Sequence, residues 1–185
     1  RYLIMGTIGA TFYIIGVGML YMSTGSLNMV DLATLIPATE GNRTVLVSLA
    51  FMTVGLGIKI ALVPLHMWMP NAYTYAPSVV SVFLAGTATK VAIYALMRIL
   101  FTVFGAADIF ENFKLSEMLS GLAIIGMIGA SSVAVYQNDV KRILAYSSLA
   151  QIGYIILGIS MASAMGIAAS LLHLFNHALI KASLF

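Results

Sequence analysis

The chain has 185 residues, of which 61% are hydrophobic and 8% are charged, and its mean hydropathy is +1.03. This composition excludes an ordinary soluble globular domain and predicts an all-α membrane protein. The formal net charge of +3 comes from basic residues that are scattered singly through apolar sequence, so no nucleic-acid partner is expected. Because the chain contains no cysteine, disulfides, thiolate metal sites and thiol catalysis are also excluded.

A bilayer core about 30 Å thick requires roughly 20 apolar residues for each helix that crosses it. Six runs meet this requirement: Tyr2 to Met22, Thr44 to Trp68, Ser78 to Val103, Met118 to Tyr136, Ile143 to Met161, and Ala164 to the end. They predict a polytopic bundle of about six transmembrane helices that forms a single transmembrane domain over residues 1–185. The chain starts without a methionine and stops inside an apolar run, so we interpret it as an internal fragment of a larger subunit.

Charged residues gather in the two longest connections. The first connection carries Asp31, Glu40 and Arg43, and its residues Asn28–Pro37 predict a short interfacial helix. The loop before the fourth run carries Asp108, Glu111, Lys114 and Glu117.

Lys59 and Lys90 lie inside runs that are apolar enough to cross a membrane. Measured along the helices from the turn near Ala72, they lie ~20 Å and ~27 Å away, at about 1.5 Å per residue. A cationic amine at this depth is costly unless it faces water or a protein interior, so it indicates proton or ion movement. The alternatives are a side chain that reaches back to the interface, or a permanent pair with an acid.

Pro64 predicts a break or kink in the second run, one turn after Lys59. Proline removes a backbone donor, and the neighbouring Gly55 and Gly57 loosen the preceding turn. A broken helix exposes carbonyl and amide groups that can hold water or ions, as in many transporters. His66 and Trp68 follow the break, where amphipathic rings often anchor a helix at the membrane interface.

The last run contains His173, His177 and Lys181 at a spacing of four, which places them on one face of a helix. Imidazoles can accept a proton on one nitrogen and donate from the other, so the row suggests a proton relay. Metal or haem ligation and plain helix packing are the alternatives. No further ligands are evident, so no cofactor is expected. The run Asn138–Arg142 predicts a solvated loop with helix capping, or a surface for a partner subunit.

Four segments carry a more specific similarity: KIALVPLHMWMPNAYTYAPS from Lys59, LAGTATKVAIYALMRI around Lys90, NDVKRILAYSSLAQIGY from Asn138, and HLFNHALIKASLF at the end. They resemble the antiporter-like proton-conducting membrane subunits. That family includes the A-type and D-type subunits of the Mrp antiporters, the L, M and N subunits of NADH:quinone oxidoreductase, and membrane-bound hydrogenase homologues. The AYTYAPS and NHALIKASLF segments look closer to the D-type antiporter or hydrogenase-type members than to the respiratory M-type member.

The resemblance implies a fold of about fourteen transmembrane helices with inverted repeats, of which this chain resembles the sixth to the eleventh. It also implies that Lys59 is the central lysine of a broken helix and Lys90 the connecting lysine. His173, His177 and Lys181 would continue the polar axis. The glutamate that pairs with the central lysine, and the exit residue, would lie outside this chain.

The expected function is a proton-translocating subunit of a multisubunit Na⁺/H⁺ antiporter in the cell's inner (plasma) membrane. Its partners would be other membrane subunits, H⁺, Na⁺ and the lipid bilayer. One alternative is a proton-pumping subunit of NADH:quinone oxidoreductase or of a membrane-bound hydrogenase, which would make the chain part of an enzyme although it holds no catalytic chemistry itself. The other alternative is a non-conducting structural subunit.

Overall fold

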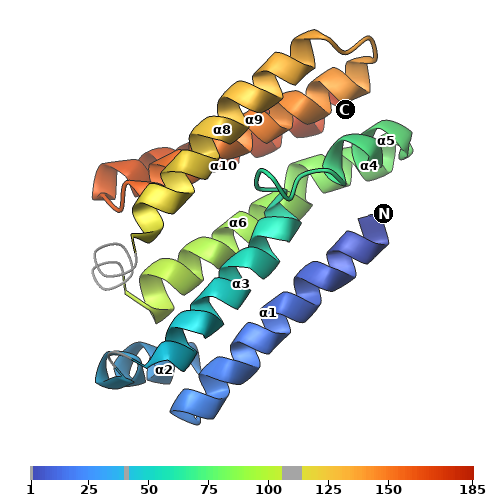
Figure 1. Cartoon of the computed structure of the whole chain (residues 1–185). Coiled ribbons are helices and arrows are strands. Elements are labelled where there is room, and N and C mark those ends of the chain that lie inside the picture. The colour runs from blue at the N-terminus through green and yellow to red at the C-terminus, as the bar shows by residue number, and fades with distance from the viewer. Residues whose placement is uncertain (1, 40–41, 106–113) are drawn as a thin grey trace.

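The computed structural model describes residues 2–39, 42–105 and 114–185, which form helices and no strand (Figure 1). The predicted all-α architecture is therefore confirmed for these ranges. Three charged residues named above, Glu40, Asp108 and Glu111, lie outside the described residues.

Within these ranges, six helical segments are long and apolar enough to cross a membrane, as the sequence predicts. They are α1 (Tyr2–Thr24), α3 (Arg43–Ile60), the segment Ser78–Val103, α8 (Leu115–Val135), α9 (Val140–Ser160) and α10 (Ala164–Leu184). The segment Ser78–Val103 consists of α5 (Ser78–Phe83), the π-helical η2 (Leu84–Ala88), α6 (Thr89–Arg98) and the π-helical η3 (Ile99–Val103).

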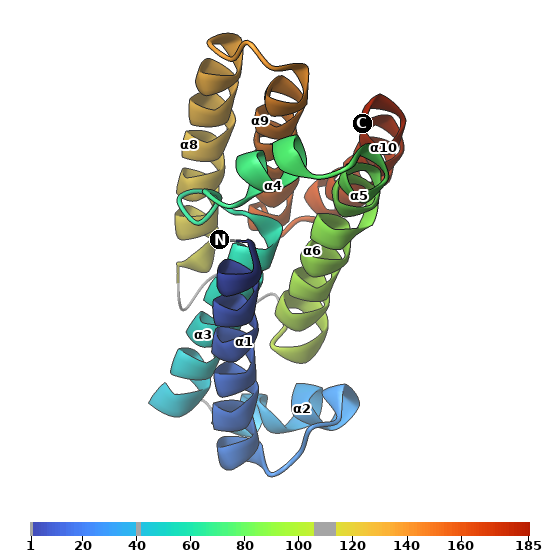
Figure 2. The same cartoon turned by 90° about the vertical axis from the view of Figure 1, so that its right-hand side faces the viewer.

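The predicted short helix of the first connection is α2 (Met29–Leu35), followed by the 3₁₀ turn η1 (Pro37–Thr39). The Asn28 side chain accepts a hydrogen bond from the backbone N–H of Val30 and so caps the start of α2. Figure 2 shows α2 lying across the end of the bundle where α1 ends and α3 begins.

The second span ends at Ile60 rather than at Trp68, which corrects the predicted boundary. Ala61 adopts the left-handed conformation with φ of 65°. The N–H groups of Ala61 and Leu62 then donate to the carbonyls of Ile58 and Gly57, at 3.2 and 2.8 Å. This double closure is a Schellman motif, which satisfies the last carbonyls of a helix. The helical path resumes at α4 (Met69–Tyr75), so the predicted break near Pro64 is confirmed.

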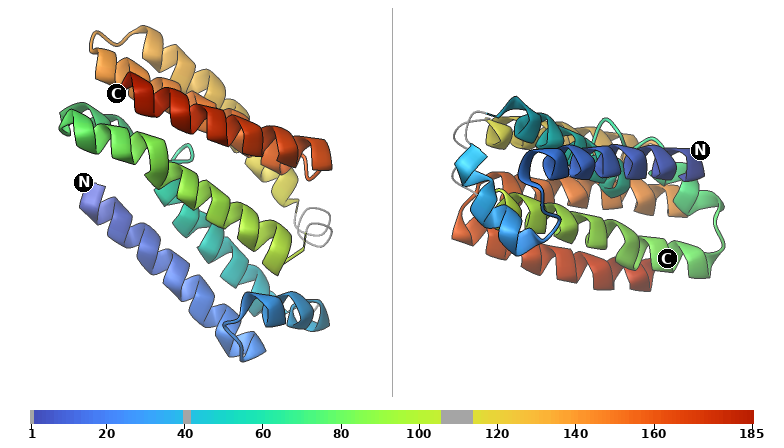
Figure 3. Two further views of the ribbon diagram at one scale, coloured as in Figure 1. Left: turned by 180° about the vertical axis from the view of Figure 1, so that it is seen from behind. Right: turned by 90° about the horizontal axis from the view of Figure 1, so that it is seen from below.

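The long helices pack in two groups that meet at the Ser78–Val103 segment. α1 packs along α3, while α8 packs along α9 and α9 along α10. α3 contacts α6, and α10 contacts α5 and η2, so the middle segment joins the two groups. Figure 3 shows α10 running beside this segment on the face opposite to the viewer of Figure 1. The π-helical η2, directly before the lysine-bearing α6, is therefore a neighbour of the histidine-bearing α10.

The contact between α1 and α3 is close enough to require glycine. A Cβ atom added at Gly16 would lie 2.8 Å from the carbonyl oxygen of Ser48 and 2.9 Å from the backbone nitrogen of Met52. Small residues let helix backbones approach in this way in membranes, where packing rather than hydrophobicity drives association. The position of α1, which covers the Lys59 side of α3, depends on this contact.

Replacing Gly16 by leucine should separate α1 from α3 and lower the stability of the subunit by about 1–3 kcal/mol, as for other overpacked interiors. Thermal unfolding of the full-length subunit in detergent would measure the loss. Gly18→Leu is the matched control, since a Cβ at Gly18 on the same helix meets nothing within 4 Å. Equal midpoints for the two variants would contradict the close approach.

Candidate functional site

The broken end of α3 is closed by a tryptophan. The indole Nε1–H of Trp68 donates to the carbonyl of Ile58 at 2.8 Å, and Trp68 is only 7% exposed. Trp68 therefore lies in the protein interior. The indole adds a second donor to a carbonyl near the helix end, which also accepts from the backbone N–H of Ala61.

Lys59 lies in the last turn of α3, directly before the break. Its side chain is exposed in this structure and lines a hollow of about 480 Å³. The hollow is formed by α1, by Ile58 and Trp68, and by Ala88 of η2. Among the described residues, no carboxylate pairs with the Lys59 amine.

Lys90 occupies a different environment. It lies in the first turn of α6 and is 6% exposed. Its Nζ donates to the carbonyl of Ala85 within η2. The neighbouring carbonyl of Leu84 accepts a hydrogen bond from the hydroxyl of Tyr73 at 3.2 Å. A π-helical turn interrupts the regular hydrogen-bond ladder, so its carbonyls are available to side chains in this way.

The polar face of α10 forms as its spacing predicts. The rings of His173 and His177 stack with centroids 6.2 Å apart and an angle of 7°. His177 and Lys181 are each 3% exposed, and the Lys181 Nζ donates to the carbonyl of Leu144 in α9 at 3.0 Å. Both ring nitrogens of His177, and Nε2 of His173, are buried without a protein partner. Buried polar atoms of this kind usually bind ordered water.

The packing of η2 on α10 brings Lys90 to this row of side chains. A Cβ at Gly86 would lie 3.4 Å from the Cβ of Ala182, so the two elements touch. Lys90 and Lys181 both lie close enough to His177 to interact with it electrostatically. We call Lys90, His173, His177 and Lys181 the basic cluster.

Lys59 does not join the basic cluster. Ala88 lines the hollow that holds Lys59, whereas Lys90, two residues further along, interacts electrostatically with Lys181 of α10. The η2–α6 segment therefore stands between the hollow and the basic cluster. The sequence correctly predicts that both lysines lie in membrane-spanning segments. It does not predict the π-helical turn η2, on which the separation of the two lysines depends.

Two further contacts, which the sequence reasoning missed, hold α4 against α9. Arg142 donates to the Asn71 side chain at 3.0 Å, and the Lys141 Nζ donates to the carbonyl of Ala76 at 3.2 Å. The predicted capping is confirmed, because the Asp139 side chain accepts from the backbone N–H of Lys141 at 2.8 Å. The tertiary contacts could not be predicted, since they join residues about seventy positions apart.

The described part of the chain contains no group of three or more His, Cys, Asp or Glu side chains that could hold a metal ion.

Replacing Trp68 by phenylalanine keeps an aromatic ring but removes the donor to Ile58. We expect a loss of about 1 kcal/mol, the usual net contribution of one hydrogen bond. Faster hydrogen exchange at the amides of Ala61 and Leu62, measured by mass spectrometry, should report a looser break. Tyr75→Phe is the control, because Tyr75 is 79% exposed. Unchanged exchange in the Trp68 variant would show that the indole does not close the helix end.

Comparison with known proteins gives a family for this arrangement. Residues 1–185 match the family described as "NADH:quinone oxidoreductase/Mrp antiporter, TM". The sequence is 48% identical over 185 residues to the N-type subunit of the NADH-quinone oxidoreductase of Desulforudis audaxviator, and it covers 36% of that protein. It is 33% identical to the D-type subunit of the Na⁺/H⁺ antiporter of Alkalihalophilus pseudofirmus. This alignment covers 100% of this chain and 37% of that protein.

A solved structure has the same fold. In the Mrp complex from a Dietzia species, one chain superposes on 98% of this chain with a TM-score of 0.85 and 32% identity, over 33% of its own length. The chain thus spans about a third of the length of the relatives it matches. The chain belongs to the family of multi-pass transmembrane subunits that the NADH:quinone oxidoreductases share with the Mrp antiporters.

Proposed function

We propose that this chain is part of a proton-translocating subunit, in which protons pass between the Lys59 hollow and the basic cluster across the η2–α6 segment. The observation that carries this proposal is the basic cluster itself. Two amines and two imidazoles lie together in membrane-spanning helices, and no carboxylate among the described residues pairs with either amine. Permanently charged amines in such a place would be very costly.

The free-energy cost of burying these amines is lower if each amine can lose its proton reversibly and if water is bound beside it. The unpartnered ring nitrogens of His177 give water both a donor and an acceptor in the middle of the cluster. Lys90 and Lys181 already donate to main-chain carbonyls, so each amine has a polar contact in either protonation state. When one group of the basic cluster gains or loses a proton, the protonation energy of the other groups changes. Protons can therefore move through the cluster one step at a time.

Lys59 supplies the second group in this proposal. α1 forms one wall of its hollow, and we place the acidic partner of Lys59 in the remainder of the subunit, of which this chain covers about a third. The described residues would then form part of one larger transmembrane domain. The Trp68 cap and the α4–α9 contacts support this role, because they fix the break beside Lys59 without using its amine.

The driving reaction is the second part of the proposal. The sequence motifs favour a Na⁺/H⁺ antiporter, but identity to the N-type subunit of a quinone oxidoreductase is higher, at 48% against 33% for the D-type subunit of an antiporter. We therefore favour a redox-driven proton pump of the plasma membrane, assembled with other membrane subunits. Antiport remains the second candidate, supported by the fold shared with the Mrp complex.

Lys90→Met should abolish proton transport by the native complex in proteoliposomes, while assembly stays normal. Lys90→Arg is the informative companion, because arginine keeps the charge but does not release its proton. We expect it to fail as well. Arg98→Gln, which removes an exposed cation from the same helix, should transport protons at the wild-type rate. Wild-type transport in Lys90→Met would contradict the proposal and favour a non-conducting subunit.

Lys59→Ala tests the hollow independently of the basic cluster. It should also abolish proton transport, because it removes the titratable group before the break but none of the contacts that close the break. The same vesicles distinguish the driving reactions. Proton uptake driven by quinone reduction and unaffected by Na⁺ supports the oxidoreductase, whereas uptake that requires a Na⁺ gradient supports the antiporter.

A further inference from the structure

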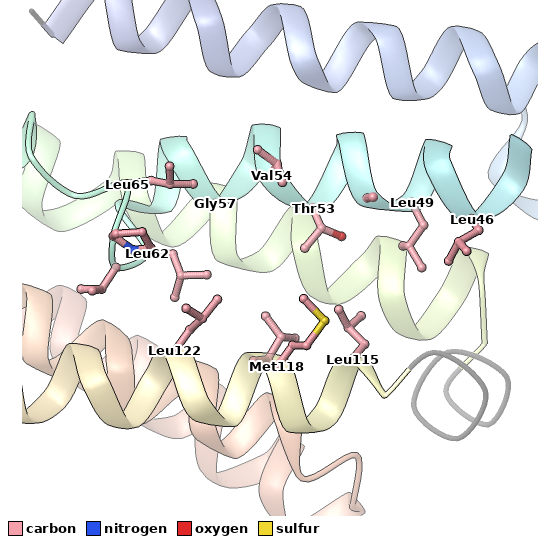
Figure 4. Close-up of a pocket in the computed structure, with 14 residues that line it drawn as sticks. Leu46, Leu49, Thr53, Val54, Gly57, Leu62, Leu65, Leu115, Met118 and Leu122 are labelled. Carbon is pink, nitrogen blue, oxygen red and sulfur yellow. The ribbon is translucent and has the colours of Figure 1, made fainter. Parts of the chain in front are cut away.

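The break after α3 borders an apolar hollow on α8 and continues into the short helix α4. The hollow has a volume of about 240 Å³ and is lined by α3, α8 and the turn that carries Pro64 (Figure 4). Thr53 is the one polar side chain among the residues that line it, and none of them is titratable. Hollows without polar partners stay dry, so this side of the break offers no path for a proton. The polar contacts of the break run instead through α4, which begins after Trp68.

Tyr73 connects α4 to the π-helical turn before Lys90. It is 1% exposed, and its hydroxyl donates to the Leu84 carbonyl of η2 at 3.2 Å. The next carbonyl along η2, that of Ala85, accepts from Nζ of Lys90. Two successive carbonyls of this turn therefore bind polar side chains, one from α4 and one from α6.

Three further contacts hold Tyr73 in place. Its carbonyl accepts from the hydroxyl of the buried Ser81 in α5 at 2.9 Å. Its ring meets the ring of Phe185 edge-on, with centroids 5.4 Å apart and an angle of 86°. The buried hydroxyl of Thr89 interacts with the Tyr73 hydroxyl and has no other polar partner. Because a phenol hydroxyl both donates and accepts, Tyr73 can donate to Leu84 while it accepts from Thr89.

The geometry of η2 determines where the Lys90 amine lies. A π-helical turn is closed by i→i+5 bonds and holds about one residue more than an α-helical turn. If η2 were α-helical, Lys90 would be rotated about the helix axis relative to α5, away from its present contacts. π-helical turns are rare, and they often occur at functional sites. A side chain that binds one carbonyl of η2 stabilises the geometry in which the next carbonyl binds Lys90.

We propose that Tyr73 is a positioning residue for Lys90. Its hydrogen bond to the Leu84 carbonyl, oriented by Thr89, holds η2 in the π-helical form, in which the next carbonyl binds the Lys90 amine. This inference rests on the proposed role of Lys90 in proton transfer and adds the group that sets its surroundings. Because a carbonyl stabilises a protonated amine more than a neutral one, the geometry of η2 affects how readily Lys90 releases its proton.

Other titratable groups also act on Lys90. Among the described residues of the elements packed against η2 and α6, Lys181 and His177 of α10 interact with it electrostatically. α3 carries Lys59, which lies in its own hollow. Removing the Tyr73 hydroxyl leaves all three of these groups in place, so a change in the behaviour of Lys90 would come from η2.

Tyr73→Phe removes the hydroxyl and keeps the ring that contacts Phe185. Proton transport by the native complex in proteoliposomes is measured as a function of pH. On the alkaline side, the pH of half-maximal transport should fall by about one unit, because losing a hydrogen bond to a charged group changes proton affinity about ten-fold. A general loss of stability would lower the rate equally at every pH. Tyr75→Phe, which removes the exposed hydroxyl of the same helix, should keep the wild-type profile.

Thr89→Val tests the contact that orients Tyr73. It removes the second hydroxyl but keeps the shape of the side chain, and we expect a smaller shift in the same direction. The double variant should match Tyr73→Phe alone, because Thr89 acts through Tyr73. Thr89→Ser keeps a hydroxyl and should retain the wild-type profile. Shifts that add in the double variant would contradict the proposal.

Hydrogen exchange at the amides of residues 84–90, measured by mass spectrometry on the same complexes, tests Tyr73 without relying on transport. Exchange should be faster in Tyr73→Phe than in the wild type or in Tyr75→Phe. Unchanged exchange, or an unchanged pH of half-maximal transport, would overturn the role of Tyr73. Failure of the proton-transfer proposal is recognised separately, by wild-type transport in Lys90→Met.

Discussion

The structure depends on one constraint: within a membrane, polar backbone groups and charges must be satisfied by the protein itself. The break after α3 shows how the sequence meets it. The Schellman closure at Ala61 and Leu62 uses two of the carbonyls at the helix end, and the Trp68 indole donates to Ile58. A non-helical segment is thereby tolerated beside Lys59. Without these contacts, a helix break at this depth would leave several carbonyls without donors.

The same constraint explains the division between the two lysines. Lys90 is buried, and its amine uses a carbonyl that the π-helical turn makes available, whereas Lys59 faces a hollow of about 480 Å³. The η2–α6 segment separates the two environments and carries residues of both, because Ala88 lines the hollow and Lys90 interacts electrostatically with Lys181 of α10. A proton that moves between them must pass this segment.

The sequence predicts the spans well because apolar runs and proline have direct physical consequences. The six spans, the short helix before Pro37 and the break near Pro64 follow from them, as does the common face of His173 and His177. It fails where a tertiary contact decides. The burial of Trp68 and the π-helical turn before Lys90 depend on neighbouring elements, and the preference for an antiporter rested on a few variable residues. Identity over this chain is 48% to an N-type oxidoreductase subunit and 33% to a D-type antiporter subunit, so the comparisons do not support that preference.

The central claim is that the basic cluster is hydrated and exchanges protons, and ordered water at His177 tests it most directly. A cryo-electron microscopy map of the full-length subunit in its complex, at a resolution that reveals water, would show it. The account predicts water bound to the ring nitrogens of His177 and connecting them to Lys90 or Lys181. A dry cluster packed by apolar side chains, or a carboxylate fixed against either amine, would contradict it.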